Sequence, residues 1–145
     1  ASKTLKQNLK TYLSQFIPLT DGVDIKDAFV INIGIKYEIV ALSDNAARDV
    51  ILNCNNLLID YFNIDNWSIN QPINLSRLYT LLDRVKGVQT VKNITVYNKA
   101  GGKYSLNEYD VQGATKENIV YPSYDPSIFE VKYPNDDIEG RVTTL

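Results

Sequence analysis

The chain has 145 residues, of which 44% are hydrophobic and 22% charged, which is typical of one soluble globular domain. Fifteen basic against seventeen acidic residues leave a net charge of −2, which argues against nucleic acid as a partner. There is no histidine and a single cysteine, so serine–histidine and cysteine–histidine catalysis, histidine- or thiolate-ligated metal sites and internal disulfides are excluded. We expect no cofactor and no metal.

Two further absences bear on where the protein is made. No apolar run of about 18 residues and no signal-peptide pattern is present, so we expect synthesis inside a cell and no membrane partner. Methionine is also absent, even at position 1. We therefore expect a fragment or processed product of a longer chain, in which Ala1-Ser2 is a cloning remnant.

Residues 1–26 form a leading helix and turn in this prediction. Apolar residues recur there at helical spacing and predict a helix that ends before Pro18. These apolar residues are Leu5, Leu9, Tyr12, Leu13 and Phe16. A turn at Thr20-Asp21-Gly22 follows.

Residues 29–41 alternate and predict a long, half-buried strand. One face is apolar and the other is mostly polar. The apolar face carries Phe29, Ile31, Ile33, Ile35, Tyr37 and Ile39; the opposite face carries Asn32, Gly34, Lys36 and Glu38.

Two helices are predicted next. Ser43-Asp44 supplies a cap, and an apolar stripe of 3.6 period follows on Ala46, Ala47, Val50, Ile51, Cys54, Leu57, Leu58, Tyr61 and Phe62. Cys54 lies within this stripe, so we interpret it as buried filler and not as a nucleophile. Asn74 is expected to cap the second helix, which carries Leu75, Leu78, Leu81, Leu82 and Val85 and is predicted to stop at Gly87.

A strand over 88–97 precedes Gly101-Gly102-Lys103, which could be a phosphate loop or a turn. A phosphate loop needs glycine five residues before Gly102, where Tyr97 stands, and a hydroxyl after the lysine, where Tyr104 stands. We therefore predict a hairpin turn, with a return strand from Lys103. A last strand is predicted over 127–133.

The predicted order gives an α+β fold in a single domain over residues 1–145, with two consecutive helices packed on a small sheet. Its core is strand–helix–helix–strand over 27–98. A hairpin return and an irregular, strand-containing tail occupy 99–145.

Paired carboxylates could act as acid and base without histidine. The candidates are Asp60 with Asp65, and a tail group on Asp136, Asp137 and Glu139. Both sets follow helix ends or prolines, so we interpret them as solvated loop acids and name no catalytic residue.

Tyrosine is concentrated in the last third of the chain, where its ring can cover apolar area while its hydroxyl stays hydrogen-bonded. These side chains could form a protein interface, or they could simply cover a thin sheet. With Phe129, the candidate interface residues are Tyr97, Tyr104, Tyr109, Tyr121, Tyr124, Phe129 and Tyr133.

Several segments together resemble the C-terminal domain of the baseplate wedge protein of T-even-like contractile-tailed bacteriophages, in the J-like baseplate family. The most specific are INQPI at 69–73, KGVQTV at 86–91 and IFEVKYPNDDIEGRV at 128–142; LKTYLSQFIPLT at 9–20 and VINIGIKYEIV at 30–40 accompany them. The resemblance implies a structural virion protein without catalytic residues. It also implies that two copies associate through this domain and that wedges join in a ring around the tail hub, after assembly in the host cytoplasm.

Two other functions remain open. Trp67 and the tyrosines could serve a carbohydrate-binding or host-recognition module of a phage tail. A histidine-free glycosidase is the third alternative, which the paired carboxylates would have to support.

Overall fold

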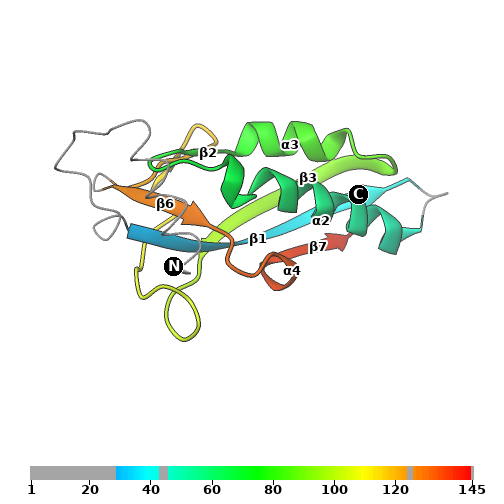
Figure 1. The fold of residues 1–145 in the computed structure, drawn as a ribbon. Helices are drawn as coiled ribbons and strands as arrows, with labels where there is room; N and C mark the ends of the chain where they lie inside the picture. The colour runs from blue at the N-terminus through cyan, green and yellow to red at the C-terminus, as the bar shows by residue number, and fades with distance from the viewer. Residues whose placement is uncertain (1–28, 43–45, 124–125, 145) are drawn as a thin grey trace.

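The computed structural model describes residues 29–42, 46–123 and 126–144. The expected α+β fold is confirmed: a four-stranded sheet is covered on one face by helices (Figure 1). The predicted helix over residues 5–16 and the turn after it lie outside the described residues. In the part that is described, no helix is long and apolar enough to cross a membrane.

Strand β1 (Phe29–Ala41) is the centre of the sheet. Strand β3 (Val88–Asn98) pairs with it antiparallel along one side. On the other side two short strands follow one another, both parallel to β1: β6 (Ser127–Glu130) beside its first residues and β7 (Ile138–Val142) beside its second half. The turn of helix α4 (Pro134–Asp137) joins these two strands.

Helix α2 (Ala47–Tyr61) and helix α3 (Leu75–Asp83) cover one face of the sheet (Figure 1). The apolar stripe of α2 buries Val50, Cys54 and Leu58, and that of α3 buries Leu75, Leu78 and Leu82. These side chains meet the odd-numbered residues of β1 in one core. The expected packing faces of both middle helices are therefore confirmed at these positions.

Helix ends agree with the prediction at one of two caps. Asn74 Oδ1 accepts a hydrogen bond from the amide of Arg77 at 3.1 Å, as expected for an N-cap. The N-cap of α2 is Ala46, without a side-chain cap, because the helix begins after Ser43 and Asp44, which lie outside the described residues. Gly87 does not end α3: the helix ends at Asp83, and Gly87, at φ 94°, turns the chain into β3.

Tyr37 explains why a glycine stands opposite it on β7. The Tyr37 hydroxyl donates to Asn55 Oδ1 at 2.6 Å, so the ring leans across the sheet beneath α2. A Cβ on Gly140 would meet the Cζ atom of that ring at 2.2 Å. A larger residue at 140 would have to displace Tyr37 from its contacts with α2.

The turn at Gly101-Gly102 is confirmed, but the return strand after it is not. Both glycines have positive φ, and the Tyr104 amide donates to the Gly101 carbonyl at 3.0 Å. From Lys103 the chain runs as a loop across the face of the sheet that the helices leave uncovered, held by side-chain hydrogen bonds in place of a strand ladder. Asn32 anchors it, because Asn32 Oδ1 accepts from the Ser105 amide at 2.7 Å.

This loop also changes the burial of β1. Asn32, predicted to face solvent, is fully buried, whereas Phe29, predicted to lie on the core face, is 42% exposed. Ala46 and Ala47, assigned to the helix stripe, are exposed at its first turn. The hydrophobic periodicity of the sequence predicted the buried face correctly in the middle of each element. It failed near the ends, where burial depends on whether a loop covers the residue.

A second, smaller sheet lies beside the first. It consists of β2 (Ile73–Asn74), β5 (Ile119–Val120) and β4 (Thr115–Lys116), all antiparallel. Glu117 and Asn118 both have positive φ, as a tight two-residue hairpin requires. This hairpin is a feature that the sequence prediction missed.

The last predicted strand is also shorter than expected. The structure ends it at Glu130 and then adds α4 and β7. The prediction therefore missed both the parallel pairing and the fourth strand of the sheet.

Candidate functional site: two tyrosine surfaces and an open sheet face

The structure divides the seven predicted interface residues between separate places. Tyr97, Tyr104 and Tyr133 gather around shared lysines and one ring contact, whereas Tyr109 is hydrogen-bonded to Tyr121. Phe129 is 1% exposed and belongs to the core, so in this fold it has no surface to offer a partner. Tyr124 lies outside the described residues.

Tyr97, Tyr104 and Tyr133 form a lysine–tyrosine cluster with four lysines. The Tyr104 and Tyr133 rings meet edge to face at 5.6 Å between centroids. Each lysine ammonium lies within 6 Å of at least one of the three rings, which is the range of a cation–π contact; the lysines are Lys36, Lys99, Lys103 and Lys132. Lys132 Nζ also donates to the Lys103 carbonyl.

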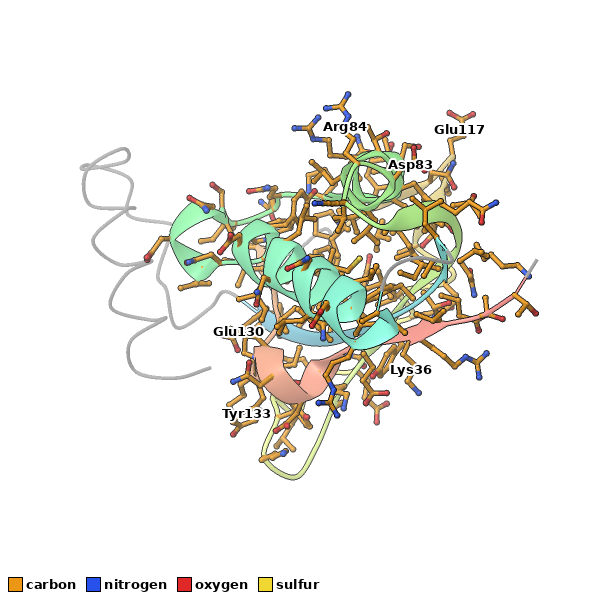
Figure 2. All side chains as sticks on the ribbon, turned by 90° about the vertical axis from the view of Figure 1, so that its right-hand side faces the viewer. Lys36, Asp83, Arg84, Glu117, Glu130 and Tyr133 are labelled. Carbon is orange, nitrogen blue, oxygen red and sulfur yellow. The ribbon has the colours of Figure 1, made fainter. Side chains whose placement is uncertain are left out.

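Figure 2 shows the side of the sheet on which this cluster lies. Lys36 and Tyr133 project below the sheet, while Asp83 and Arg84 at the end of α3 project above it. The cluster therefore occupies the face of the sheet opposite the helices.

Asp137 is the buried anion at the centre of this cluster. Its carboxylate accepts from Tyr104 Oη at 2.7 Å and from the Tyr133 amide at 3.3 Å, and it pairs with Lys99 Nζ at 3.0 Å. The Asp137 side chain is 1% exposed, so the expectation that this carboxylate is a solvated loop acid is wrong. Folding of the 99–105 loop onto α4 buries it, which the sequence pattern could not reveal.

The hydrogen bond to Asp137 raises the pKa of Lys99 above its ordinary range. Burial, followed by the hydrogen bond to Asp137, raises the pKa of Tyr104. Lys99 is therefore charged and Tyr104 neutral throughout the physiological pH range, so this group is a fixed ion pair that fastens the loop to α4. It offers no free base at neutral pH.

The other four carboxylates of the predicted pairs lie at the surface. Asp60, Asp65, Asp136 and Glu139 are exposed, as expected, but they do not lie in loops: Asp60 belongs to α2, Asp65 to a short 3-10 helix, Asp136 to α4 and Glu139 to β7. Among the described residues, no three His, Cys, Asp or Glu side chains gather so as to hold a metal ion.

The second tyrosine surface surrounds a hollow of about 1000 Å³. The Tyr109 hydroxyl donates to the Tyr121 carbonyl at 2.6 Å, and the Tyr109 ring lies 6.2 Å from that of Phe129. Tyr121 is 46% exposed. The aromatic and apolar lining of the hollow comes from Pro72, Tyr109, Ala114, Tyr121 and Pro122, and its polar lining from Asn70, Lys116, Glu117 and Ser123.

Trp67 is not at either surface. It is 7% exposed and packs against Tyr61 and Phe62, with ring centroids 5.5 and 5.3 Å away. It therefore cannot act as the stacking platform on which the carbohydrate-binding alternative depended.

A third feature, which the sequence prediction did not identify, is a groove of about 500 Å³ on the face of the sheet opposite the helices, lined mostly by charged and polar residues. Charges alternate across neighbouring strands there: Lys36 stands opposite Glu139, and Glu38 opposite Arg141. Arg141 Nη2 lies 2.6 Å from Glu38 Oε1. The signal in the sequence was the short segment Ile138–Val142, whose two charges flank a glycine.

No protein-family model matches the chain, and a search among curated proteins finds no relative. The resemblance to the baseplate wedge protein therefore stays a prediction from the segments quoted above.

Proposed function

We propose that this chain is a structural domain of a bacteriophage tail baseplate, which binds other copies of itself and neighbouring wedge subunits and carries no catalytic activity. Its place is the virion, where wedges join in a ring around the tail hub. The segments that resemble the baseplate wedge family support this proposal, because three of them, at 30–40, 86–91 and 128–142, supply most of the central sheet.

The observation that carries the proposal is the aromatic hollow beside Tyr109 and Tyr121. Almost half of the Tyr121 surface is exposed, and Pro122 beside it is only partly buried. Aromatic rings that are held rigid and half exposed are typical anchors for a protein partner. Because the Tyr109 hydroxyl is already bonded within the chain, a partner would gain the ring surface without having to order the side chain.

The carbohydrate-binding alternative loses its main support with the burial of Trp67. Tyr97 and Tyr104 are also a poor substitute, since lysines already lie over their rings. A scaffold domain remains the better explanation of the exposed aromatic surface.

The test uses the virus that encodes this chain. We expect mass spectrometry of purified tails to find the protein, and an antibody against it to label the baseplate end in electron micrographs. Tyr121→Ala in the full-length protein should block the joining of wedges, whereas Tyr79→Phe, which changes a tyrosine bonded within the fold to the Ile94 amide, should not. Tails that lack the protein, or complete baseplates built from the Tyr121→Ala variant, would contradict the proposal.

A further inference from the structure

The direction of the backbone groups on β7 can be read from its pairing with β1. The Thr143 amide donates to the Ile39 carbonyl at 2.8 Å, and Ile39 is the register partner of Val142. In a parallel ladder a residue bonds to the two neighbours of its register partner, while the partner itself points the other way. The carbonyls that point away from β1 are therefore those of Ile138, Gly140 and Val142. The amides of Gly140 and Val142 point away from β1 as well.

This outer edge of β7 is open in the part of the chain that the structure describes. No hydrogen bond from a described residue reaches the outward groups of Gly140 or Val142. The edge carries no proline and no bulge, which are common ways of blocking an exposed strand.

Parts of the other two edges of the sheet are covered by specific contacts. On β3, the Ile94 amide donates to Tyr79 Oη at 3.0 Å and the Val96 carbonyl accepts from Gln112 Nε2 at 2.9 Å. On β6, the backbone amide of Asn70 donates to the Ser127 carbonyl at 2.7 Å, and the Ser127 amide donates to Asn70 Oδ1 at 3.1 Å. On Gly140 and Val142 of β7, in contrast, no outward group has such a contact within the described residues.

The sequence of β7 is complementary to itself. If two β7 strands meet antiparallel about Gly140, Glu139 lies opposite the partner's Arg141, and Ile138 opposite the partner's Val142. Gly140 and the partner's Gly140 then form a hydrogen-bonded pair, and the Ile138 carbonyl accepts from the amide of the partner's Val142. Glu139 and the partner's Arg141 occupy a non-hydrogen-bonded pair, in which side chains are closest.

The charges continue this pattern beyond the two edge strands. Within the chain Lys36 stands opposite Glu139, and Glu38 opposite Arg141. A row across the joined sheet would read Lys36, Glu139, the partner's Arg141 and the partner's Glu38, with alternating sign at each step. The symmetry of the pair repeats this row once more in the opposite direction.

We propose that a second copy of this chain pairs through β7, antiparallel and centred on Gly140, to form one continuous sheet across a two-fold axis. The inference rests on the self-association in the proposed function and assigns it to a particular edge. The aromatic hollow at Tyr121 then remains available for a neighbouring subunit of another kind.

The test is a charge-reversal mixing experiment on β7, followed by sedimentation equilibrium. Glu139→Lys makes both charges of the strand positive, and Arg141→Glu makes both negative. Each variant alone should dimerise roughly tenfold more weakly than the wild type or worse, because like charges then face each other twice. An equimolar mixture restores both opposite-charge pairs, so it should form a heterodimer within about threefold of the wild-type dissociation constant.

The fold should survive these changes, because Glu139 is exposed and the Arg141 side chain is 71% exposed. The matched controls are Arg84→Glu and Asp83→Lys, which reverse exposed charges at the end of α3, above the sheet in Figure 2 and outside the lining of the aromatic hollow. They should leave the dissociation constant unchanged, alone or mixed.

A second measurement is independent of charge. A Glu139→Cys/Arg141→Cys double variant should give two intermolecular disulfides on mild oxidation, since cysteines in facing non-hydrogen-bonded positions lie within disulfide range. The only native cysteine, Cys54, is fully buried and should not take part. Asn93→Cys/Thr95→Cys, on the same face of β3, should stay monomeric under the same oxidation.

The outcomes separate this inference from the proposed function. A wild-type dimer that is unaffected by Glu139→Lys and Arg141→Glu would place self-association elsewhere and overturn the β7 pairing alone. A mixture that fails to associate while the wild type does would overturn it as well. A wild-type chain that never associates would overturn both the pairing and the self-association.

Discussion

Replacing Lys99 by methionine should destabilise the domain more than any other single lysine change in the lysine–tyrosine cluster. The substitution keeps most of the side chain's apolar length but removes the cation that lies 3.0 Å from Asp137. Asp137, with its side chain 1% exposed, would then be a buried carboxylate without a counter-charge.

The magnitude follows from the contacts that remain. Breaking a buried ion pair by removing one partner costs about 3–5 kcal/mol. Tyr104 Oη and the Tyr133 amide still donate to the carboxylate, so we expect about 3 kcal/mol, a large part of a stability of about 5–15 kcal/mol. Urea unfolding followed by the fluorescence of buried Trp67 should show the midpoint falling by about 1–3 M.

The matched control is Lys103→Met. Lys103 is exposed and lies over the Tyr133 ring at 4.6 Å without an acid partner among the described residues, so its loss should cost under about 1 kcal/mol. Equal midpoints for Lys99→Met and Lys103→Met at neutral pH would refute the reasoning.

Three further predictions concern the core. Cys54→Ser should lower stability by about 1–3 kcal/mol, since it buries a hydroxyl in an apolar site, and native Cys54 should react with a thiol reagent only as fast as the domain opens; rapid labelling of the folded protein would contradict its burial. Burial raises the pKa of Cys54 from 9.0 to about 11. The pKa of Tyr37 is also raised above its usual range, mainly by burial and to a smaller extent by the nearby Cys54. As the pH rises, the unfolded chain therefore loses both protons before the folded one does. The contribution of these two groups to stability should thus be constant between about pH 6 and pH 8 and be lost from about pH 9 upward, with a shallower fall in Cys54→Ala; a profile that stays flat from pH 8 to pH 11 would contradict this. Val50→Asp or Leu82→Asp should cost several kcal/mol by burying an unpaired charge, and a melting temperature equal to the wild type's would show that the helix faces are assigned wrongly.

Local sequence patterns were sufficient for the elements that the chain forms by itself. The alternation over 29–41 and the 3.6-residue stripes of α2 and α3 predicted these elements and most of their buried residues, because each buries one face along its length. The Asn74 cap was predicted for a similar reason, since its hydrogen bond closes within three residues.

Elements that depend on distant partners were not predicted. The return strand from Lys103 failed because the loop bonds to Asn32, about seventy residues earlier in the chain, instead of to its neighbour β3. β7 was missed because five residues after a proline turn give a weak signal, and only its place beside β1 makes it a strand.

The candidate site shows the same division. Tyrosine enrichment predicted an aromatic surface, and the structure keeps Tyr121 half exposed but places Phe129 in the core. Asp137 could not be recognised as the buried anion, since its partner Lys99 lies 38 positions earlier and is brought to it only by the fold.

The central claim, that this domain associates with its own copies, is tested most directly by sedimentation equilibrium of the wild-type chain from about 1 µM to 1 mM. A single dimer interface that is reinforced by ring closure in the assembly can be weak on its own. We therefore predict a reversible monomer–dimer equilibrium with a dissociation constant of tens of micromolar or above, corresponding to about 6–7 kcal/mol of association free energy. One monomer mass across the whole concentration range would contradict the claim.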